Sequence, residues 1–302
     1  MKRLLCTLAL LATFTAHAEI VVQDDTGATL RLTEPARRIV SLAPHVTETL
    51  FAAGAGAQIV GAVDYSDYPE TAKRVPRVGG YSRLDLEAIA ALQPDLVVGW
   101  ASGNAPTHID KLRALGIPVY LAQPERIDDV AKNLERYGQL AGTSAVAQVA
   151  AAAFRGRLQT LREKYGTRPK VRTFYQIWKQ PLMTVGGGQV ISDVIHLCGG
   201  ENVFAGLKPL APKVTVEAVI QTDPEVIIAS GMGESRPEWL DDWRRWKTLT
   251  AVQRDNLFFI PPDLIQRHTP RLVEGADRLC AHLETARGKR KQGVARDGVP
   301  VQ

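Results

Sequence analysis

The chain has 302 residues, of which 45% are hydrophobic and 23% charged, and its formal net charge is +5. This charge is too small to indicate a nucleic-acid partner, and after residue 18 no apolar run approaches the roughly 20 residues of a membrane-spanning helix. The length suits two domains that can each bury a core.

Residues 1–18 have the features of a secretory signal peptide. Lys2 and Arg3 form a basic start, an apolar run extends from Leu4 to Phe14, and Ala16-His17-Ala18 fits a cleavage site. The apolar run is too short to cross a bilayer. We therefore expect an exported, soluble protein that begins at Glu19 after cleavage near Ala18.

Residues 19–142 alternate between short apolar segments and helical patterns. We expect strands at 20–32, 38–42, 58–63, 96–100 and 118–121, and helices at 48–54, 84–92, 108–115 and 127–141. Alternation at this short spacing predicts a wound α/β lobe with a parallel sheet.

Residues 143–166 contain the most strongly helical stretch, Ser144 to Tyr165. It is rich in alanine, and apolar residues recur at three- and four-residue steps: Val146, Val149, Ala153, Phe154, Leu158 and Leu161. At about 1.5 Å per residue it spans roughly 33 Å, more than one α/β unit needs. We interpret it as a strut between two lobes; the alternative is an ordinary amphipathic helix within one domain.

The strand and helix pattern resumes over residues 167–287. We expect strands at 171–176, 226–230 and 257–260, and helices at 190–197, 216–221, 239–247 and 270–285. The segment Leu86–Val98 aligns without gaps on Val216–Ile228, and this alignment places Glu87 opposite Glu217. The sequence therefore favours two parallel-sheet α/β lobes, joined by a single long backbone helix and facing each other across a cleft. Residues 288–302 are expected to form a flexible basic tail, together with the preceding Arg287.

Two cysteines remain after the predicted signal peptide, Cys198 and Cys280. An even pair in an exported chain suggests one disulfide, and the alternative is two buried free thiols.

Motifs of catalysis are missing from the sequence. It contains no hydrolase elbow, no P-loop, no His-Glu-x-x-His and no Cys-x-x-Cys, so we do not expect an enzyme. The glycines Gly186–Gly188 could offer backbone N–H groups to an anion, although a tight turn explains them as well. Five histidines lie scattered along the chain after residue 18, and we expect loop or surface positions for them: His45, His108, His196, His268 and His282. Of these, His45 follows a strand in a position where it could contact a ligand axially.

Aromatic residues are few, but several fall in predicted loops at strand ends. These are Tyr65, Tyr68, Tyr81 and Trp100 in the first lobe and Trp178 in the second. As a set they suggest the walls of a binding cleft for a large, partly apolar ligand.

Three segments carry a resemblance that covers nearly all of the chain after residue 18. They are Tyr65-Ser-Asp-Tyr-Pro69, Leu197-Cys-Gly-Gly-Glu-Asn202, and Asp263 through Arg271 leading to Cys280. With these segments the chain resembles the periplasmic substrate-binding proteins of ABC importers, of the helical-backbone type that carries cobalamin, haem or iron–siderophore. Within that family it is most similar to the members that bind cobalamin.

The resemblance implies roles for individual residues. Tyr65 and Trp100 match residues of the pocket that holds the corrin, and Asp263 and Arg267 match the loop on the other side of the cleft. Cys198 and Cys280 match a family disulfide. Glu87 and Glu217 match two glutamates that dock on arginines of the permease. This chain departs from the family at three aromatic positions. Tyr81 and Ala211 each occupy the place of a tryptophan, and Ile177 occupies the place of an aromatic residue, with Trp178 next to it.

The expected protein is thus a periplasmic monomer without a cofactor of its own and without a nucleic-acid partner. It would bind a corrinoid as cargo and deliver it to an importer permease in the inner membrane. Two alternatives remain open: the same fold binding haem or a ferric siderophore, with Tyr65 or His45 as an iron ligand, or an exported enzyme that uses the cleft.

Overall fold

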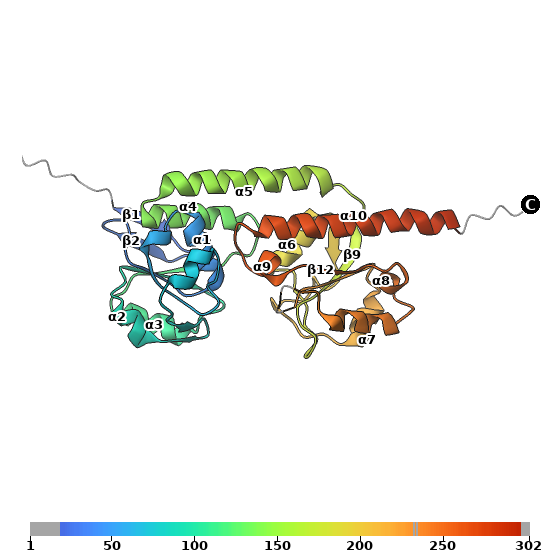
Figure 1. The fold of residues 1–302 in the computed structure, drawn as a ribbon, viewed down its shortest axis with the longest axis horizontal. Coiled ribbons are helices and arrows are strands. Elements are labelled where there is room, and N and C mark those ends of the chain that lie inside the picture. Colours follow the sequence, from blue (N-terminus) through green and yellow to red (C-terminus); the bar gives the residue numbers. More distant parts are fainter. Residues whose placement is uncertain (1–18, 232, 234, 297–302) are drawn as a thin grey trace, which may run out of the picture.

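The computed structural model describes residues 19–231, 233 and 235–296. The predicted signal peptide and residues 297–302 of the predicted tail lie outside these described residues. Figure 1 shows two lobes side by side, with the helices α5 (Ser144–Tyr165) and α10 (Leu272–Arg296) along one edge of the molecule. Within the described ranges, no helix combines the length and the apolarity that a membrane span requires.

The first lobe is built on a four-stranded parallel sheet with the strand order β4-β3-β7-β8. Its strands are β3 (Ile39–Ser41), β4 (Ile59–Ala62), β7 (Leu96–Trp100) and β8 (Val119–Ala122), and its helices are α1 (Pro44–Ala52), α2 (Leu86–Ala91), α3 (Pro106–Ala114) and α4 (Asp129–Ala141). Two antiparallel pairs accompany them, β1 (Ile20–Gln23) with β2 (Thr29–Leu32) and β5 (Gly79–Gly80) with β6 (Arg83–Leu84). Short 3₁₀ turns occupy Gly56–Gln58 and Glu70–Arg74.

The second lobe repeats this plan with the parallel order β10-β9-β11-β12. Its strands are β9 (Val171–Gln176), β10 (Gly200–Asn202), β11 (Val226–Ala229) and β12 (Leu257–Phe259), and its helices are α6 (Val190–Leu197), α7 (Val216–Thr222), α8 (Thr250–Gln253) and α9 (Pro262–Ile265). The helix expected over 239–247 is a 3₁₀ segment, Glu238–Arg245. The predicted fold class, two parallel α/β lobes joined by α5, is confirmed.

The internal repeat is visible in the backbone as well as in the sequence. Asp85 caps α2 by accepting from the N–H of Ala88, and Thr215 caps α7 in the same way from Ala218. After each helix, a non-glycine residue at the matched position takes a left-handed conformation, with φ of 46° at Gln93 and 39° at Asp223. The two segments are therefore structural as well as sequence equivalents.

The helix α5 has the predicted bounds, but the predicted apolar stripe is wrong in its first half. Val146 and Val149 are 53% and 72% exposed, and the buried positions there are Ala147 and Ala151. The cause is the close approach of α4, where a Cβ added to Gly138 would lie 2.3 Å from the Cβ of Ala147. Only small side chains fit between helices packed so closely, so alanines face inward and the valines face solvent.

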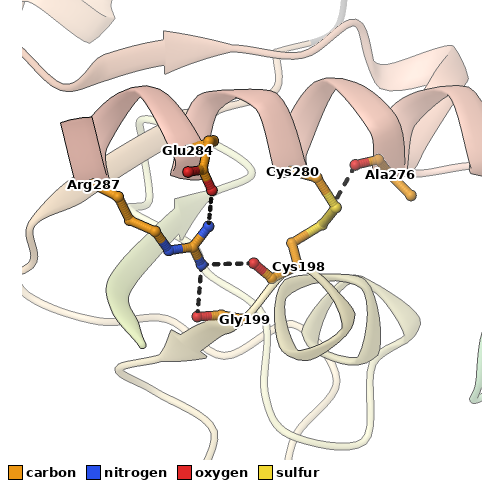
Figure 2. Close-up of a disulfide and its surroundings, with 6 residues drawn as sticks. All are labelled: Cys198, Gly199, Ala276, Cys280, Glu284 and Arg287. Carbon is orange, nitrogen blue, oxygen red and sulfur yellow. Dashed lines mark hydrogen bonds and ion pairs between the residues drawn. A yellow bond between two sulfur atoms is a disulfide. The ribbon is translucent and has the colours of Figure 1, made fainter. Parts of the chain in front are cut away.

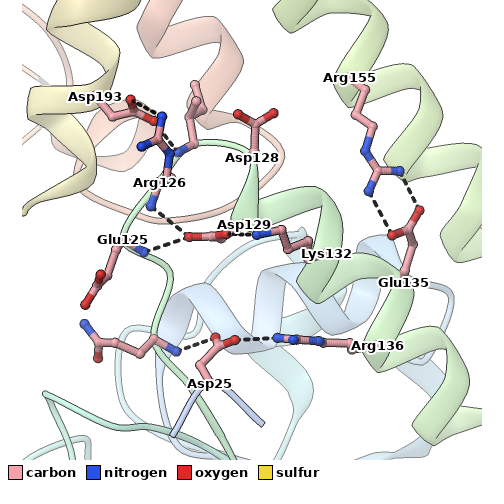
Figure 3. Close-up of polar contacts among 12 residues, drawn as sticks. Asp25, Glu125, Arg126, Asp128, Asp129, Lys132, Glu135, Arg136, Arg155 and Asp193 are labelled. Carbon is pink, nitrogen blue, oxygen red and sulfur yellow. Dashed lines mark hydrogen bonds and ion pairs between the residues drawn. The ribbon is translucent and has the colours of Figure 1, made fainter. Parts of the chain in front are cut away.

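Polar contacts tie α4 to its neighbours in both lobes (Figure 3). Arg155 of α5 makes two hydrogen bonds to Glu135 of α4, at 2.5 and 2.8 Å. Asp193 of α6 accepts from the N–H of Ile127 at 2.9 Å and pairs with Arg126 at 3.6 Å. The bonds from Arg155 join the strut to the first lobe, and the contacts of Asp193 join the second lobe to the first.

The disulfide suggested by the cysteine count is present between Cys198 and Cys280, and it joins the end of α6 to α10 (Figure 2). Next to it, Arg287 is 6% exposed and donates to the carbonyls of Cys198 and Gly199, which are left without helical partners at the end of α6.

The flexible tail was predicted too early in the chain. The helix α10 continues through Arg296, and Arg290 forms two bonds to Glu225, at 2.5 and 2.6 Å. The basic residues Arg287, Lys289 and Arg290, which look like a solvated cluster in the sequence, thus bind a carboxylate and carbonyl oxygens of distant segments.

Candidate ligand-binding cleft

A cavity of about 280 Å³ lies between the two lobes. The first lobe contributes Pro44, His45, Tyr65, Tyr81 and Trp100, and the second contributes Gly231, Pro262, Asp263, Gln266, Arg267 and His268. Five of the six residues expected to contact a ligand therefore meet here. Trp178, the sixth, lies outside the cavity, where its indole N–H donates to the carbonyl of Gln180.

Tyr65 projects into solvent at the edge of the cavity, with 76% of its surface exposed. Its φ is 63°, a left-handed conformation that costs a bulky residue about 1–3 kcal/mol. The next residue holds it there: Ser66 is fully buried, its hydroxyl accepts from Thr47 at 2.9 Å, and its carbonyl accepts from Arg77 at 2.9 Å. A strained, exposed aromatic beside a cleft is typical of a contact residue.

Tyr81 and Trp100 form the rest of the aromatic wall, with ring centroids 5.9 Å apart. Both are positioned by Asn104, which is 3% exposed. Its side-chain oxygen accepts from the N–H of Trp100 at 2.6 Å, and its nitrogen donates to the carbonyls of Tyr81 and Leu42. Asn104 is not among the residues predicted from the sequence, although a polar residue in the Ser-Gly-Asn-Ala-Pro segment after an aromatic strand end is a signal of such a bridge.

The floor of the cavity contains two histidines that the sequence gave no reason to pair. His45 and His268 are 7% and 9% exposed, and their ring centroids are 5.4 Å apart. The expectation of a loop or surface position is wrong for His45, because the helix α1 begins at Pro44, four residues earlier than predicted, and His45 lies in its first turn. His268 lies in the loop after α9, as expected, but it is buried. Proline is well suited to the first helical position because its missing N–H has no partner there in any case.

Burial determines the charge state of these rings. Desolvation lowers the pKa of His268 to about 4. Desolvation, and then the nearby His268 and Arg267, hold the pKa of His45 well below its ordinary value. Both imidazoles are therefore neutral near pH 7, in the form that can bind a metal ion.

Charged residues of the second lobe close the other side of the cleft. Arg267 contacts Asp67 of the first lobe at 2.6 Å and Asp263 at 3.2 Å. Partial burial would raise the pKa of Asp67, but the hydrogen bond and the charge of Arg267 outweigh it and lower this pKa overall. Asp67 stays ionised and links the lobes, a role that sequence analysis did not assign to it.

A second ion pair joins the lobes outside the lining of this cavity. Arg271 forms two hydrogen bonds of 2.7 Å to Glu48 of α1, and the side chains are only 17% and 3% exposed. The guanidinium also lies 3.8 Å from the centre of the Tyr68 ring. Together with Arg267–Asp67, this contact links the two lobes.

A larger cavity of about 820 Å³ lies away from the aromatic wall, beside the loop of Gly187 and Gly188. Arg126 and Lys170 line it, but so do Glu125, Asp193 and Glu201. Since opposite charges are mixed in its lining, the glycine loop does not gain the positive surroundings that an anion site requires.

Glu87 and Glu217 occupy the second position of α2 and α7, and both are exposed. In Figure 1 these helices lie at the lower edge of the two lobes, on the side away from α5. Hydrogen bonds from its own backbone N–H and from Thr215 lower the pKa of Glu217. The two carboxylates thus stand at equivalent points of similar lobes.

Comparison with known proteins agrees with this architecture. The sequence profile of the family described as periplasmic binding protein matches residues 39–264. The chain belongs to this family. It is 39% identical over 260 residues to a vitamin B12-binding protein of Vibrio parahaemolyticus, covering 85% of this chain and 93% of that one.

Two solved structures superpose on this chain over most of its length. The periplasmic vitamin B12 binding protein BtuF of Vibrio cholerae matches with a TM-score of 0.78 and 38% identity, covering 84% of this chain and 98% of that one. A periplasmic heme-binding protein, RhuT from Roseiflexus, matches with a TM-score of 0.71 and 24% identity over 83% of this chain and 99% of that one. The second likeness is one of fold alone. These relatives are binding proteins rather than enzymes.

Proposed function

We propose that this protein captures cobalamin, or a closely related corrinoid, in the cleft between its lobes and delivers it to the permease of an ABC importer. The observation that supports this most is the composition of the cleft. Tyr65, Tyr81 and Trp100 form an aromatic wall on one lobe, opposite Asp263 and Arg267 on the other. The names of the relatives from Vibrio support the same ligand.

In this proposal each wall meets a different part of the corrinoid. The aromatic wall packs on the apolar face of the macrocycle, while Arg267 and Asp263 hydrogen-bond to polar groups at its edge. Tyr65, exposed at the mouth of the cavity, contacts the part of the ligand that extends beyond 280 Å³.

Affinity measurements on variants of the aromatic wall test the proposed site. Replacing Trp100 by alanine removes a large anchor, and we expect a cyanocobalamin affinity at least about 10-fold weaker, or 1.4 kcal/mol. Trp246→Ala is the matched control, because Trp246 packs against Trp243 outside the cavity. Equal affinities of both variants and the unaltered protein would contradict the assigned site.

Delivery requires a surface that a permease can recognise, and we assign it to Glu87 and Glu217. Their equivalent positions suit a partner with twofold symmetry, and ion pairs with arginines would set the orientation. We further infer a periplasmic monomer released from its signal peptide near Ala18, with no role for nucleic acid.

Haem is the second candidate, and one observation favours it. His45 and His268 are neutral, buried imidazoles at the floor of the cleft, and a neutral imidazole is a common ligand of haem iron. Titration with hemin in parallel with cyanocobalamin separates the two candidates.

A further inference from the structure

Two imidazole rings at the floor of the cleft have nitrogens without hydrogen-bond partners. Nε2 of His45 and both ring nitrogens of His268 are buried from solvent and have no partner among the described residues. A buried polar group left without a partner destabilises the fold, so it calls for a physical explanation.

The position of the pair points to the ligand as the missing partner. His45 comes from α1 of the first lobe, and His268 follows α9 of the second lobe, so the rings meet where the lobes face each other. Both line the cavity, and the ring of His45 also lies 5.2 Å from that of Trp100, edge to face. A macrocycle seated on the aromatic wall would thus lie beside both imidazoles.

We infer that one imidazole of the His45–His268 pair coordinates the cobalt of a bound corrinoid whose axial ligand can be exchanged. This inference rests on the proposed function and adds a ligand class to it. An imidazole nitrogen forms a bond to Co(III) while the bond from cobalt to an axial water breaks. The water leaves with both its protons, and no electron or proton is transferred because the imidazole is already neutral.

Coordination of this kind needs only one protein ligand, since the corrin ring and the lower axial base of the corrinoid would supply the others. That agrees with the rest of the structure, in which the described residues contain no group of three or more metal-binding side chains. The second imidazole of the pair remains next to the first, with the ring centroids 5.4 Å apart.

Visible absorption of bound aquocobalamin tests this inference, because exchange of axial water for imidazole shifts the corrin bands. We expect a shift on mixing the unaltered protein with aquocobalamin and none with cyanocobalamin, whose cyanide is not displaced. The shift should disappear in His45→Ala/His268→Ala and persist in His196→Ala, which alters an exposed histidine of α6 outside the cleft.

Two results would overturn the inference: aquocobalamin that binds, as measured by calorimetry, without any shift, or a shift that persists in the double variant. The first result needs only the unaltered protein, so it holds even if the double variant does not fold. The variant His45→Phe/His268→Phe keeps aromatic packing and loses no side-chain hydrogen bond, so it serves as a second double variant in the absorption experiment. If neither aquocobalamin nor cyanocobalamin binds, the proposed function is wrong as well as the inference.

Discussion

The buried ion pair between Arg271 and Glu48 makes the lobe interface sensitive to a single substitution. In Arg271→Met the carboxylate of Glu48, whose side chain is 3% exposed, would remain in the interface without its cation. Removing one partner of a buried pair typically costs about 3–5 kcal/mol, because the other charge is left without compensation. Loss of the stacking of Arg271 on Tyr68 adds to this cost.

Urea unfolding followed by tryptophan fluorescence measures the effect. With a slope of about 3 kcal/mol per molar urea, the midpoint of Arg271→Met should fall by about 1 M or more. The double variant Glu48→Met/Arg271→Met should recover most of the loss, since it buries no charge. The matched control is Arg31→Met, which breaks an exposed pair with Glu19 and should cost less than about 1 kcal/mol.

Either of two results would contradict a stabilising role of the buried charge pair. Arg271→Met could prove no less stable than Arg31→Met, which would mean that water reaches Glu48 and solvates it. Alternatively, the double variant could be as unstable as the single one, which would mean that shape rather than charge holds the interface.

Three further predictions concern the disulfide, the docking surface and acid stability. The variant Cys198→Ser/Cys280→Ser removes the disulfide, whose cysteines are 82 residues apart, and should lower the free energy of unfolding by roughly 4 kcal/mol. A loss below about 1 kcal/mol in urea unfolding would contradict the chain-entropy argument. Glu87→Ala/Glu217→Ala should abolish corrinoid uptake through the permease in reconstituted vesicles while cyanocobalamin affinity stays unchanged, and normal uptake would remove the two glutamates from the docking surface. The pKa of His268 is about 4 in the folded protein and about 6.5 in the unfolded chain, so between these pH values only the unfolded chain binds the proton. The free energy of unfolding should therefore fall as the pH drops from 6.5 to 4, by up to about 3 kcal/mol. His268→Gln should reduce this pH dependence of stability. Equal pH profiles of the variant and the unaltered protein would contradict the lowered pKa of His268.

Local patterns were sufficient for the fold. The bounds of α5 followed from alanine content and flanking turn residues, and the aligned segments of the two lobes have matching caps and matching left-handed residues at Gln93 and Asp223. These features depend on neighbours in the sequence, which is why the sequence alone reveals them.

Features set by distant partners could not be predicted in this way. The sequence gives Val146 and Val149 as the apolar face of α5, but Gly138 of another helix decides that alanines face inward. The length of α10 depends likewise on Arg290 meeting Glu225, 65 residues away.

In the candidate site, too, features of the local sequence could be predicted and contacts between the lobes could not. Aromatic residues at strand ends marked the cleft because parallel strands end at a common edge. The pairing of His45 with His268 was missed, because it requires the two lobes to be placed against each other before either ring has a neighbour.

The most direct test of the central claim is calorimetric titration of the purified protein, without residues 1–18, with cyanocobalamin and in parallel with hemin. The account predicts tight binding of one cyanocobalamin per chain and much weaker binding of hemin. Tight binding of hemin with no binding of cyanocobalamin would contradict it, and would assign the cleft to haem with His45 or Tyr65 as the iron ligand.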